Sequence, residues 1–295
     1  SSVATQFSYR ANAGADSKLQ DGVKGLFTLG AGAAIEERPT VTYAPLQGEA
    51  FIKRFLAQIP LETVVLLART GWSFERVLRV CLQKLGPLNN APNASGPTPA
   101  TAPDFERFVQ AAKWLRSIRV RQGLEVSLGT DGSIRGLVVR FKPTGLQMAE
   151  TRQLLDLLGR PRGTERLFFT SQAFPADKPY LRMETRSLIG VMYYLSHGVQ
   201  TSRADQEKGR VTVTLNAAGQ PFDWNQVTGE LMQVHSSPVR PDNAMVAVNY
   251  RGWWFYLDDG DLNSKSTFSL LSQLFYLQAG DAKVVAPTLT LPVGN

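Results

Sequence analysis

Residues 250–280, YRGWWFYLDDGDLNSKSTFSLLSQLFYLQAG, constrain the fold more than any other stretch of the chain. Apolar side chains alternate with polar or small ones over 246–250 and again over 253–257, which is the period of half-buried strands. Arg251 and Gly252 lie between the two runs and are short enough for a hairpin turn, in which the glycine supplies a positive φ. The sequence therefore predicts an antiparallel strand pair here.

A helix is expected directly after this strand pair. Apolar residues recur at three- and four-residue intervals from Phe268 to Phe275, as on the buried face of an amphipathic helix. Asn263 or Ser264 is the expected cap at its start, and Gly280 is placed to end it. A hairpin followed by a packed helix is typical of the α+β class. We therefore expect an antiparallel sheet with packed amphipathic helices, in one or two subdomains.

The turn before this helix carries hard oxygen donors. Asp258, Asp259, Asp261 and Asn263 all provide the ligand atoms that Ca²⁺ and Mg²⁺ prefer. The spacing departs from an EF-hand loop, because no glutamate stands at the closing position. One interpretation is a Ca²⁺ or Mg²⁺ site built from the three aspartates. The other, which we favour, is a capped turn whose carboxylates stabilise the positive end of the helix, with Lys265 pairing to one of them.

The composition of residues 89–103 predicts a break in the chain. Pro, Asn, Ala, Ser and Thr dominate there, and no apolar period runs through it. We expect an N-terminal α+β region with a helical hairpin over 1–88, a linker or long loop over 89–103, and a C-terminal α+β domain over 104–295.

Periodic patterns predict the other elements. Helices are expected over 48–59, 61–68, 74–85, 104–115, 146–158 and 185–197, and strands over 3–10, 39–43, on both sides of 130–133, over 166–172, 180–184 and 210–215.

The helices over 61–68 and 74–85 are joined by a short turn and allow two interpretations. They form a structural helical hairpin, or they form a helix-turn-helix that reads DNA with Arg76 and Arg79 turned outward. Helical hairpins are common structural units, so we favour the first.

The formal net charge of +7 suits an anionic partner such as a phospholipid, an acidic polymer or a nucleic acid. Arginines cluster at two places, and these are the candidate interaction residues: Arg116, Arg119, Arg121, Arg160 and Arg162. Neither cluster is interleaved with aromatic residues that would stack on bases. A nucleic-acid partner is therefore not expected.

No motif for catalysis stands out. The sequence holds no G-x-S-x-G elbow, no P-loop and no H-E-x-x-H. The single cysteine, Cys81, excludes an intramolecular disulfide and lies on an apolar helix face, which is typical of a buried and unreactive thiol. We expect a non-enzymatic protein without a cofactor, unless the acidic turn binds Ca²⁺ or Mg²⁺.

Four phrases resemble an uncharacterised family of bacterial proteins whose longer members carry an N-terminal lipoprotein signal. These phrases are PTVTYAPLQGEAFIKRFLAQI, GWSFERVLRVC, METRSLIGVMYYLSHGV and YRGWWFYLDDGDLNSKSTFSLLSQLFYLQAG. The resemblance implies a periplasmic location at a bacterial envelope, with anchoring through a lipidated N-terminal segment that precedes this sequence. It supplies no catalytic residues. Gly260 stands where the family has a basic residue, so a shared role of the turn does not follow.

These observations lead to three hypotheses of function. The first is a structural or assembly subunit of the envelope, acting as a homo-oligomer or with other envelope proteins through the Gly/Ala-rich residues 11–35. The second is a binding module for an anionic envelope polymer or a lipid headgroup. The third is a metal-dependent enzyme that uses the turn from Asp258 to Asp261.

Overall fold

The computed structural model of the chain describes residues 2–10, 34–42, 49–201, 205–206 and 208–279. These residues belong to two units, Ser1–Gly48 and Glu49–Asn295.

The first unit holds one antiparallel strand pair. β1 (Ser2–Arg10) pairs with β2 (Ala34–Thr42), with Ser2 opposite Thr42. The strands predicted over 3–10 and 39–43 are confirmed, and the second begins earlier than expected. Residues 11–33, most of the Gly/Ala-rich segment, lie outside the described residues.

The second unit is organised by a six-stranded sheet with the order β4-β3-β8-β7-β6-β5. Neighbouring strands are antiparallel except for β7 and β8, which are parallel. The strands are β3 (Leu82–Leu85), β4 (Leu88–Asn89), β5 (Leu124–Asp131), β6 (Ile134–Phe141), β7 (Arg166–Thr170) and β8 (Leu181–Thr185). Together with the helices, this sheet confirms the α+β class.

The β5–β6 hairpin forms at the predicted turn. Gly132 has a φ of 59°, a backbone conformation that favours glycine because glycine has no Cβ. On β6, Leu137 and Val139 belong to the main core, whereas Val138 on the opposite face packs with Phe168. Buried side chains on both faces explain why this strand reads as a continuous apolar run rather than an alternating one.

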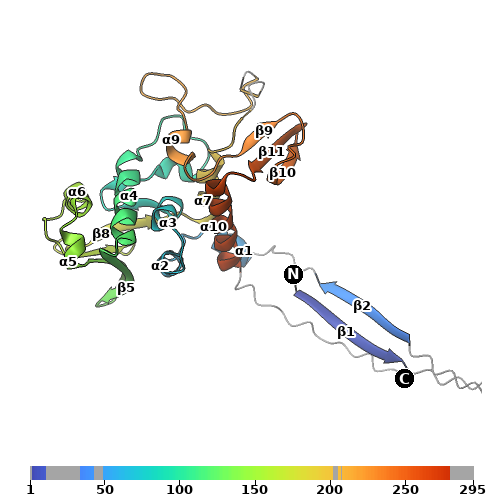
Figure 1. Cartoon of the computed structure of the whole chain (residues 1–295), viewed down its shortest axis with the longest axis horizontal. Helices are drawn as coiled ribbons and strands as arrows, with labels where there is room; N and C mark the ends of the chain where they lie inside the picture. Colours follow the sequence, from blue (N-terminus) through green and yellow to red (C-terminus); the bar gives the residue numbers. More distant parts are fainter. Residues whose placement is uncertain (1, 11–33, 43–48, 202–204, 207, 280–295) are drawn as a thin grey trace, which may run out of the picture. The chain divides into compact units, whose positions relative to one another are not determined.

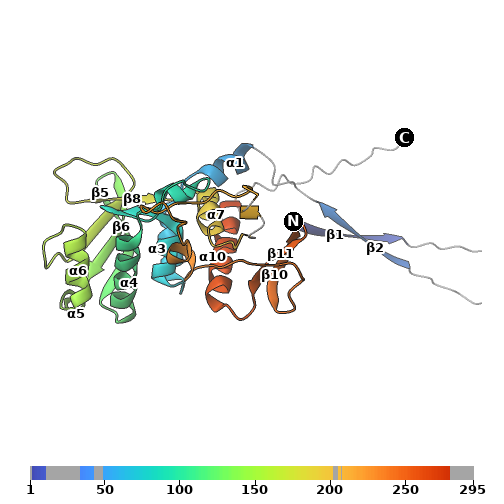
Figure 2. The same ribbon diagram turned by 90° about the horizontal axis from the view of Figure 1, so that it is seen from above.

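The helices pack around one face of the sheet and continue past it (Figures 1 and 2). They are α1 (Glu49–Leu56), α2 (Leu61–Arg69), α3 (Phe74–Cys81), α4 (Glu106–Val120), α5 (Pro143–Leu146), α6 (Ala149–Leu157), α7 (Leu188–Ser196), α9 (Asn225–Thr228) and α10 (Leu262–Ala279). α3 lies against α2, α4 and α7, so its apolar face is buried at the centre of the unit. No helix among the described residues combines the length and the apolar character needed to cross a membrane.

The helix predicted over 74–85 is too long by four residues. It ends at Cys81, and residues 82–85 form β3, with Leu82 opposite Thr185 on β8. Leu82 and Leu85 are both buried, which fits the helical period and the strand equally well. Pairing with a distant strand therefore decided the conformation, since the local pattern allowed both.

A buried arginine holds this helix-to-strand junction in place. Arg186 is 1 % exposed, and its guanidinium donates to backbone carbonyls of Arg79, Leu82 and Asn90 and to the Ser95 hydroxyl. It also lies 3.9 Å from the centre of the Tyr194 ring. Cations near a helix C-terminus satisfy its last carbonyls. Arg186 therefore joins the end of α3 to β3 and β4.

The predicted linker is packed against the core of the second unit. Ala91 and Ala94 are fully buried, and residues 92–95 form a short 3₁₀ helix. Strands from both sides of this segment contribute to the same six-stranded sheet. The segment 89–103 is therefore an ordered connection within one unit.

The strand predicted over 210–215 does not form. Only Leu215 makes bridge pairs there, with Thr101 and Pro221. Neither Thr101 nor Pro221 belongs to a strand of the described residues, so these single bridges do not extend into a ladder.

The hairpin and helix predicted over 246–279 are confirmed. β9 (His235–Ser237), β10 (Ala244–Tyr250) and β11 (Trp253–Asp258) form a sheet in the order β10-β11-β9. Both turn residues, Arg251 and Gly252, have positive φ, at 52° and 82°. Both values fit the two-residue turn that matches the twist of antiparallel strands. Gly280, the predicted end of the helix, lies outside the described residues.

Candidate functional site

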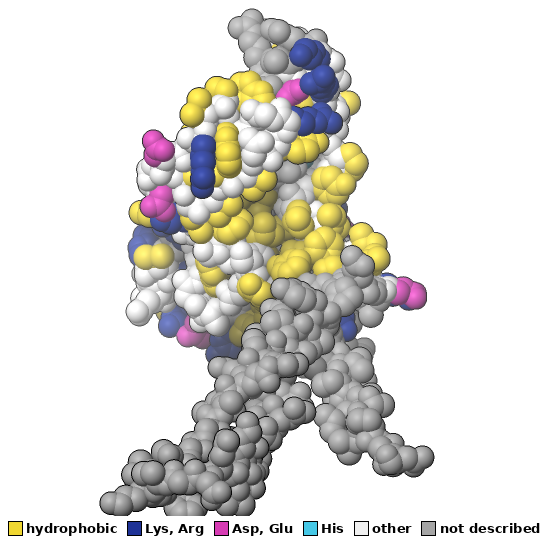
Figure 3. Space-filling model, turned by 90° about the vertical axis from the view of Figure 1, so that its right-hand side faces the viewer, with side chains coloured by type: hydrophobic (Ala, Val, Ile, Leu, Met, Phe, Trp, Pro, Cys, Tyr) yellow, Lys and Arg dark blue, Asp and Glu magenta, His cyan; other side chains and the backbone are white. Residues whose placement is uncertain are grey.

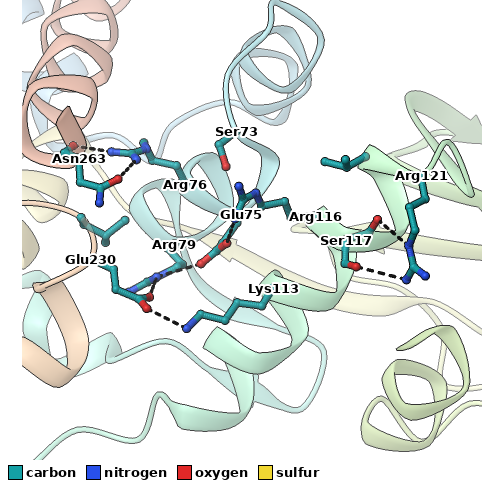
Figure 4. Close-up of a pocket in the computed structure, with 12 residues that line it drawn as sticks. Ser73, Glu75, Arg76, Arg79, Lys113, Arg116, Ser117, Arg121, Glu230 and Asn263 are labelled. Atoms are coloured by element: carbon teal, nitrogen blue, oxygen red, sulfur yellow. Dashed lines mark hydrogen bonds and ion pairs between the residues drawn. The ribbon is translucent and has the colours of Figure 1, made fainter. Parts of the chain in front are cut away.

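A cleft of about 680 Å³ opens between α3 and α4 (Figure 4). We call it the α3–α4 cleft. It is lined by Ser73, Glu75, Arg76, Arg79, Lys113, Arg116, Ser117, Val120, Arg121, Glu230, Leu231 and Asn263.

Helical spacing brings most of these side chains to the cleft. On α3, Arg79 lies four residues after Glu75 and three after Arg76, so its side chain neighbours both of them on the helix surface. On α4, Lys113, Arg116, Ser117 and Val120 follow the same spacing, while Ala112 and Leu115 are buried in the core. The cleft is thus the polar side of two helices whose apolar sides pack into the protein.

Arg79 is the buried centre of the charge network. Its side chain is 2 % exposed, and Nη1 donates to Glu75 Oε1 at 3.0 Å and to Glu230 Oε2 at 2.7 Å. Nη2 donates to the Val227 carbonyl oxygen at 3.1 Å. A buried guanidinium needs such partners, because removing its charge from water without them costs several kcal/mol.

Both carboxylates of the cleft are shared between two cations. Glu230 accepts from Arg79 and also from Lys113 Nζ at 3.0 Å. Glu75 accepts from Arg79, and its second oxygen lies 3.6 Å from Nη1 of Arg116. Three cations therefore share two negative charges.

Glu230 stays ionised at neutral pH. Its partial burial raises the pKa, but the hydrogen bonds and charges of Arg79 and Lys113 outweigh burial and lower the pKa below its usual value. A carboxylate with a lowered pKa is a poor proton donor at neutral pH. Its role in the cleft is therefore electrostatic.

Arg76 differs from the other cations, since its hydrogen bonds to the described residues all go to neutral oxygens. Nη1 donates to the Asn263 carbonyl at 2.5 Å and to Thr267 Oγ1 at 2.6 Å, and Nη2 donates to Asn263 Oδ1 at 2.8 Å. Burial lowers the pKa of Arg76, and the positive charge of Arg79 lowers it further. The guanidinium is held by three hydrogen bonds to neutral oxygens, and the charges of Glu75 and Asp261 only partly offset the effect of burial and of the neighbouring cations on its pKa.

The start of α3 also borders the cleft. Ser73 is the residue before the helix, lines the cleft, and makes no side-chain cap hydrogen bond. The first backbone N–H groups of a helix carry partial positive charge. This helix end adds to the positive potential of the cleft.

The three predicted arginines of α4 have different environments. Arg116 lines the cleft and is 58 % exposed, so its guanidinium is accessible. Arg121 also lines it but pairs with Glu150 and donates to Ser117 Oγ at 3.2 Å. Arg119 lies outside the cleft. It donates to the Ala68 carbonyl at 2.5 Å, at the end of α2, which favours a structural role.

The second arginine pair lies elsewhere. Arg160 donates to the Tyr180 carbonyl at 2.8 Å. Arg162 forms a two-point pair with Asp156 at 2.9 and 3.2 Å, which lowers the pKa of that aspartate. Neither lines the α3–α4 cleft.

The carboxylates of the acidic turn each have a separate partner. Asp258 Oδ1 accepts from the Gly260 backbone at 2.7 Å, and Asp259 Oδ1 accepts from Lys265 Nζ at 2.7 Å. Asp261 Oδ1 accepts from the backbone N–H groups of Asn263 and Ser264 at 3.0 and 3.1 Å. Asp261 is therefore the cap of α10, in place of the predicted Asn263 or Ser264, which lie inside the helix.

Within the described residues, no group of three His, Cys, Asp or Glu side chains is arranged to hold a metal ion. These separate contacts favour the capped-turn interpretation of the acidic turn. The Ca²⁺ or Mg²⁺ site stays a prediction.

The surroundings of Cys81 and His197 favour a structural role for each residue. Cys81 is fully buried, and burial raises the pKa of its thiol to about 12, so it is protonated at neutral pH. His197 stacks on Trp224 with ring centres 3.9 Å apart, and burial lowers its pKa.

An apolar patch lies on α1 and α10. Ile52, Leu56 and Tyr276 are 56, 62 and 72 % exposed, and the ring centres of Phe51 and Phe275 lie 6.2 Å apart. Figure 3 shows hydrophobic side chains gathered on the face that carries α10. Exposed apolar patches often mark contact surfaces.

The cleft depends on residues that sequence reasoning did not select. Arg79 was expected to point outward with Arg76, but it is buried against Glu75 and Glu230. The four-residue spacing of Glu75 and Arg79 is a local signal of an ion pair. No comparable signal exists for Glu230, which lies 151 residues from Arg79 in the chain.

Comparison of the chain with protein-family models, curated proteins and solved structures found no match.

Proposed function

We propose that the chain is a binding module for an anionic ligand, held in the α3–α4 cleft. One observation carries the proposal: among the described residues, five cationic side chains and two carboxylates line the cleft. Those two carboxylates are shared by Arg79, Lys113 and Arg116, Arg121 pairs with Glu150, and Arg76 bonds to neutral oxygens. The cleft therefore has positive charge to spare for a ligand.

The physical reason is electrostatic. Like charges that are partly removed from water raise each other's energy, and an anion placed among them lowers it. Arginine and lysine side chains form charge-assisted hydrogen bonds with phosphate or carboxylate oxygens, which are stronger than neutral ones. Arg116 and Lys113 are 58 and 43 % exposed, so a ligand reaches them without any change of fold.

This proposal corresponds to the second hypothesis from the sequence, a module for an anionic envelope polymer or lipid headgroup. The periplasmic location and lipid anchor stay predictions from the resemblance. The assembly role also stays a prediction, and light scattering at low and high salt tests it. A discrete multimer that persists in high salt supports assembly.

The binding proposal is tested with dextran sulfate, a soluble polyanion, titrated at several salt concentrations. Arg116→Gln and Lys113→Gln each remove one accessible charge of the cleft. We expect each to weaken binding about fivefold, since a contact at an exposed site contributes about 1 kcal/mol. Each variant is also expected to flatten the dependence of the affinity on salt.

The matched control is Arg107→Gln. Arg107 lies on the same helix, is 61 % exposed, and does not line the cleft. Its substitution removes the same charge from the same helix and is expected to change the affinity little. An equal loss in all three variants would show that net charge, and not the cleft, governs binding.

A further inference from the structure

The size of the α3–α4 cleft bears on what it binds. Its volume of about 680 Å³ lies in the range of sites for small organic ligands. A single tetrahedral oxyanion is only a few times larger than a water molecule, which takes up about 30 Å³ in the liquid. One such ion would leave most of the cleft filled with water.

The accessible cations stand on two different walls. Arg76 lies at the wall formed by α3 and α10, where Asn263 and Thr267 fix its guanidinium. Lys113 and Arg116 project from α4 (Figure 4). Two cationic positions on separate walls call for two anionic groups in one ligand, each with its own set of donors.

The types of donor favour phosphate over carboxylate. Arg116 offers a planar guanidinium that binds two oxygens at once, Arg76 keeps two of its five N–H donors after its three hydrogen bonds, and Ser73 and the first turn of α3 add neutral donors. A phosphate group presents three oxygens and often two charges, whereas a carboxylate presents two oxygens and one charge. The larger acceptor matches this number of donors.

The internal carboxylates favour a ligand that carries more than one negative charge. Glu75 and Glu230 already neutralise part of the network, so an incoming anion competes with them for Lys113 and Arg116. Glu230 is 59 % exposed, and its contact with Lys113 is open to solvent, so a ligand can take its place. A ligand with several charges competes better than a monoanion.

The lining also excludes one class of phosphate ligand. Its apolar members are Val120 and Leu231, and no aromatic ring lines the cleft among the described residues. Recognition of nucleotides without base-specific hydrogen bonds relies on stacking against aromatic rings. The cleft therefore provides for the phosphates and not for a base.

From these observations we infer that the cleft binds a diphosphate group, with one phosphate at Arg76 and the start of α3 and the other at Lys113 and Arg116. This inference rests on the proposed function and names its ligand chemistry. The diphosphate comes from a soluble compound or from the headgroup of a lipid.

The inference is tested by calorimetric titration of the intact chain with inorganic pyrophosphate and with inorganic phosphate at one ionic strength. We expect pyrophosphate to bind at least tenfold more tightly. Arg76→Gln removes the guanidinium of the first position and Arg116→Gln removes one of the two cations of the second, so each is expected to reduce this preference, and the double variant to abolish it. Arg107→Gln is the matched control and keeps the preference.

Arg76 also joins α3 to α10, so its loss affects folding as well as binding. Arg76→Lys keeps the charge but not the planar fork, and thermal melting of each variant reports on the fold. A folded Arg76→Lys variant is expected to bind pyrophosphate more weakly than the wild-type chain does. Equal affinity for the two ligands in the wild-type chain, or a preference that survives in the double variant, overturns the inference.

A second arm separates the two sources of diphosphate. Phosphatidylcholine vesicles that contain farnesyl diphosphate are compared with vesicles that contain farnesyl monophosphate, by co-sedimentation. Tighter binding to the diphosphate vesicles than to both the monophosphate vesicles and soluble pyrophosphate identifies a lipid headgroup, and binding to the diphosphate vesicles no tighter than to soluble pyrophosphate identifies a soluble ligand.

The two proposals fail in different ways. If dextran sulfate binds through Lys113 and Arg116 while pyrophosphate shows no advantage over phosphate, the diphosphate inference is wrong and the anion-binding function stands. If the cleft variants change the affinity neither for dextran sulfate nor for pyrophosphate, both proposals are wrong.

Discussion

Replacing Arg186 by methionine tests how the centre of the protein is held together. The guanidinium is buried and its described hydrogen bonds go to backbone carbonyls and one hydroxyl, with no carboxylate among these acceptors. Methionine keeps a long, flexible and apolar side chain but provides no donor. The substitution therefore removes the donors of the junction without leaving a counter-charge behind.

The contacts of each acceptor give the magnitude. The carbonyls of Arg79 and Leu82 also accept from the Asn90 side chain, so they keep a partner, and the Ser95 hydroxyl can rotate. The Asn90 carbonyl loses its charged donor inside a fully buried residue, which costs about 1 to 3 kcal/mol. Loss of the cation–π contact with Tyr194 adds about 1 to 2 kcal/mol.

The variant no longer buries a charge, and this gain offsets part of the lost stability. Burial lowers the pKa of Arg186 to about 10, so the site opposes the charged form. We expect a net destabilisation of about 3 kcal/mol, which is about 6 to 12 °C in Tm for a unit of this size.

The assay is thermal and urea denaturation of Arg186→Met beside the wild-type chain. Asn90→Ala serves as the companion variant, because it removes the other donor to the Arg79 and Leu82 carbonyls. If Arg186→Met were as stable as the wild-type chain, the cost of burying the guanidinium would equal what its hydrogen bonds contribute. Arg186 would then not be what stabilises the junction.

Three further changes give measurable results. Asp261→Ala removes the cap of α10 and is expected to cost about 1 kcal/mol at pH 7. Burial raises the pKa of Asp261, but its hydrogen bonds outweigh burial and lower the pKa, so this stabilisation is complete above pH 3.8 and is lost as the pH falls further. The Tm values of the variant and the wild type should therefore converge in acid. Glu230→Gln removes a competing charge from the cleft and should tighten dextran sulfate binding about threefold in the salt titration. Gly136→Ala places a Cβ 2.5 Å from the Phe169 carbonyl and should cost about 2 kcal/mol or more in urea denaturation, whereas Gly96→Ala, with open space around it, should cost much less.

Local turn chemistry explains which parts of the fold the sequence predicts well. Residues 130–133 and the pair Arg251 and Gly252 are turn sequences between strand-forming runs, and both hairpins form as expected. Hairpin strands meet through a short connection, so the information needed to pair them lies within a few neighbouring residues.

Long-range pairing explains the errors. Residues 82–85 suit a helix and a strand alike, and β8, far along the chain, selects the strand. Residues 210–215 alternate as a strand does but meet Thr101 and Pro221 instead of a partner strand. At α10, Asn263 and Ser264 are good caps, but Asp261 comes first and binds both of their backbone N–H groups.

The cleft could be predicted only in part for the same reason. Arg116 was selected because it lies in an arginine cluster, and helical spacing on α4 places Lys113 beside it. Arg119 belongs to the same cluster, yet it does not line the cleft and donates to the Ala68 carbonyl at the end of α2. Glu230 and Asn263 reach the cleft from segments that are distant in the sequence. No local pattern indicates that these segments lie near the cleft.

The place of β3 in the sheet has a consequence for the order of folding during synthesis. Leu82 and Arg186 are in contact but 104 residues apart in the chain, and β3 pairs with β8 just before Arg186. At about 5 to 20 residues per second, a ribosome needs about 5 to 20 seconds to extend the chain from one to the other. During that interval β3 lacks its partner strand β8, and the apolar face of α3 lacks α7. A nascent chain arrested before residue 185 is therefore expected to bind chaperones more strongly than one arrested after residue 200.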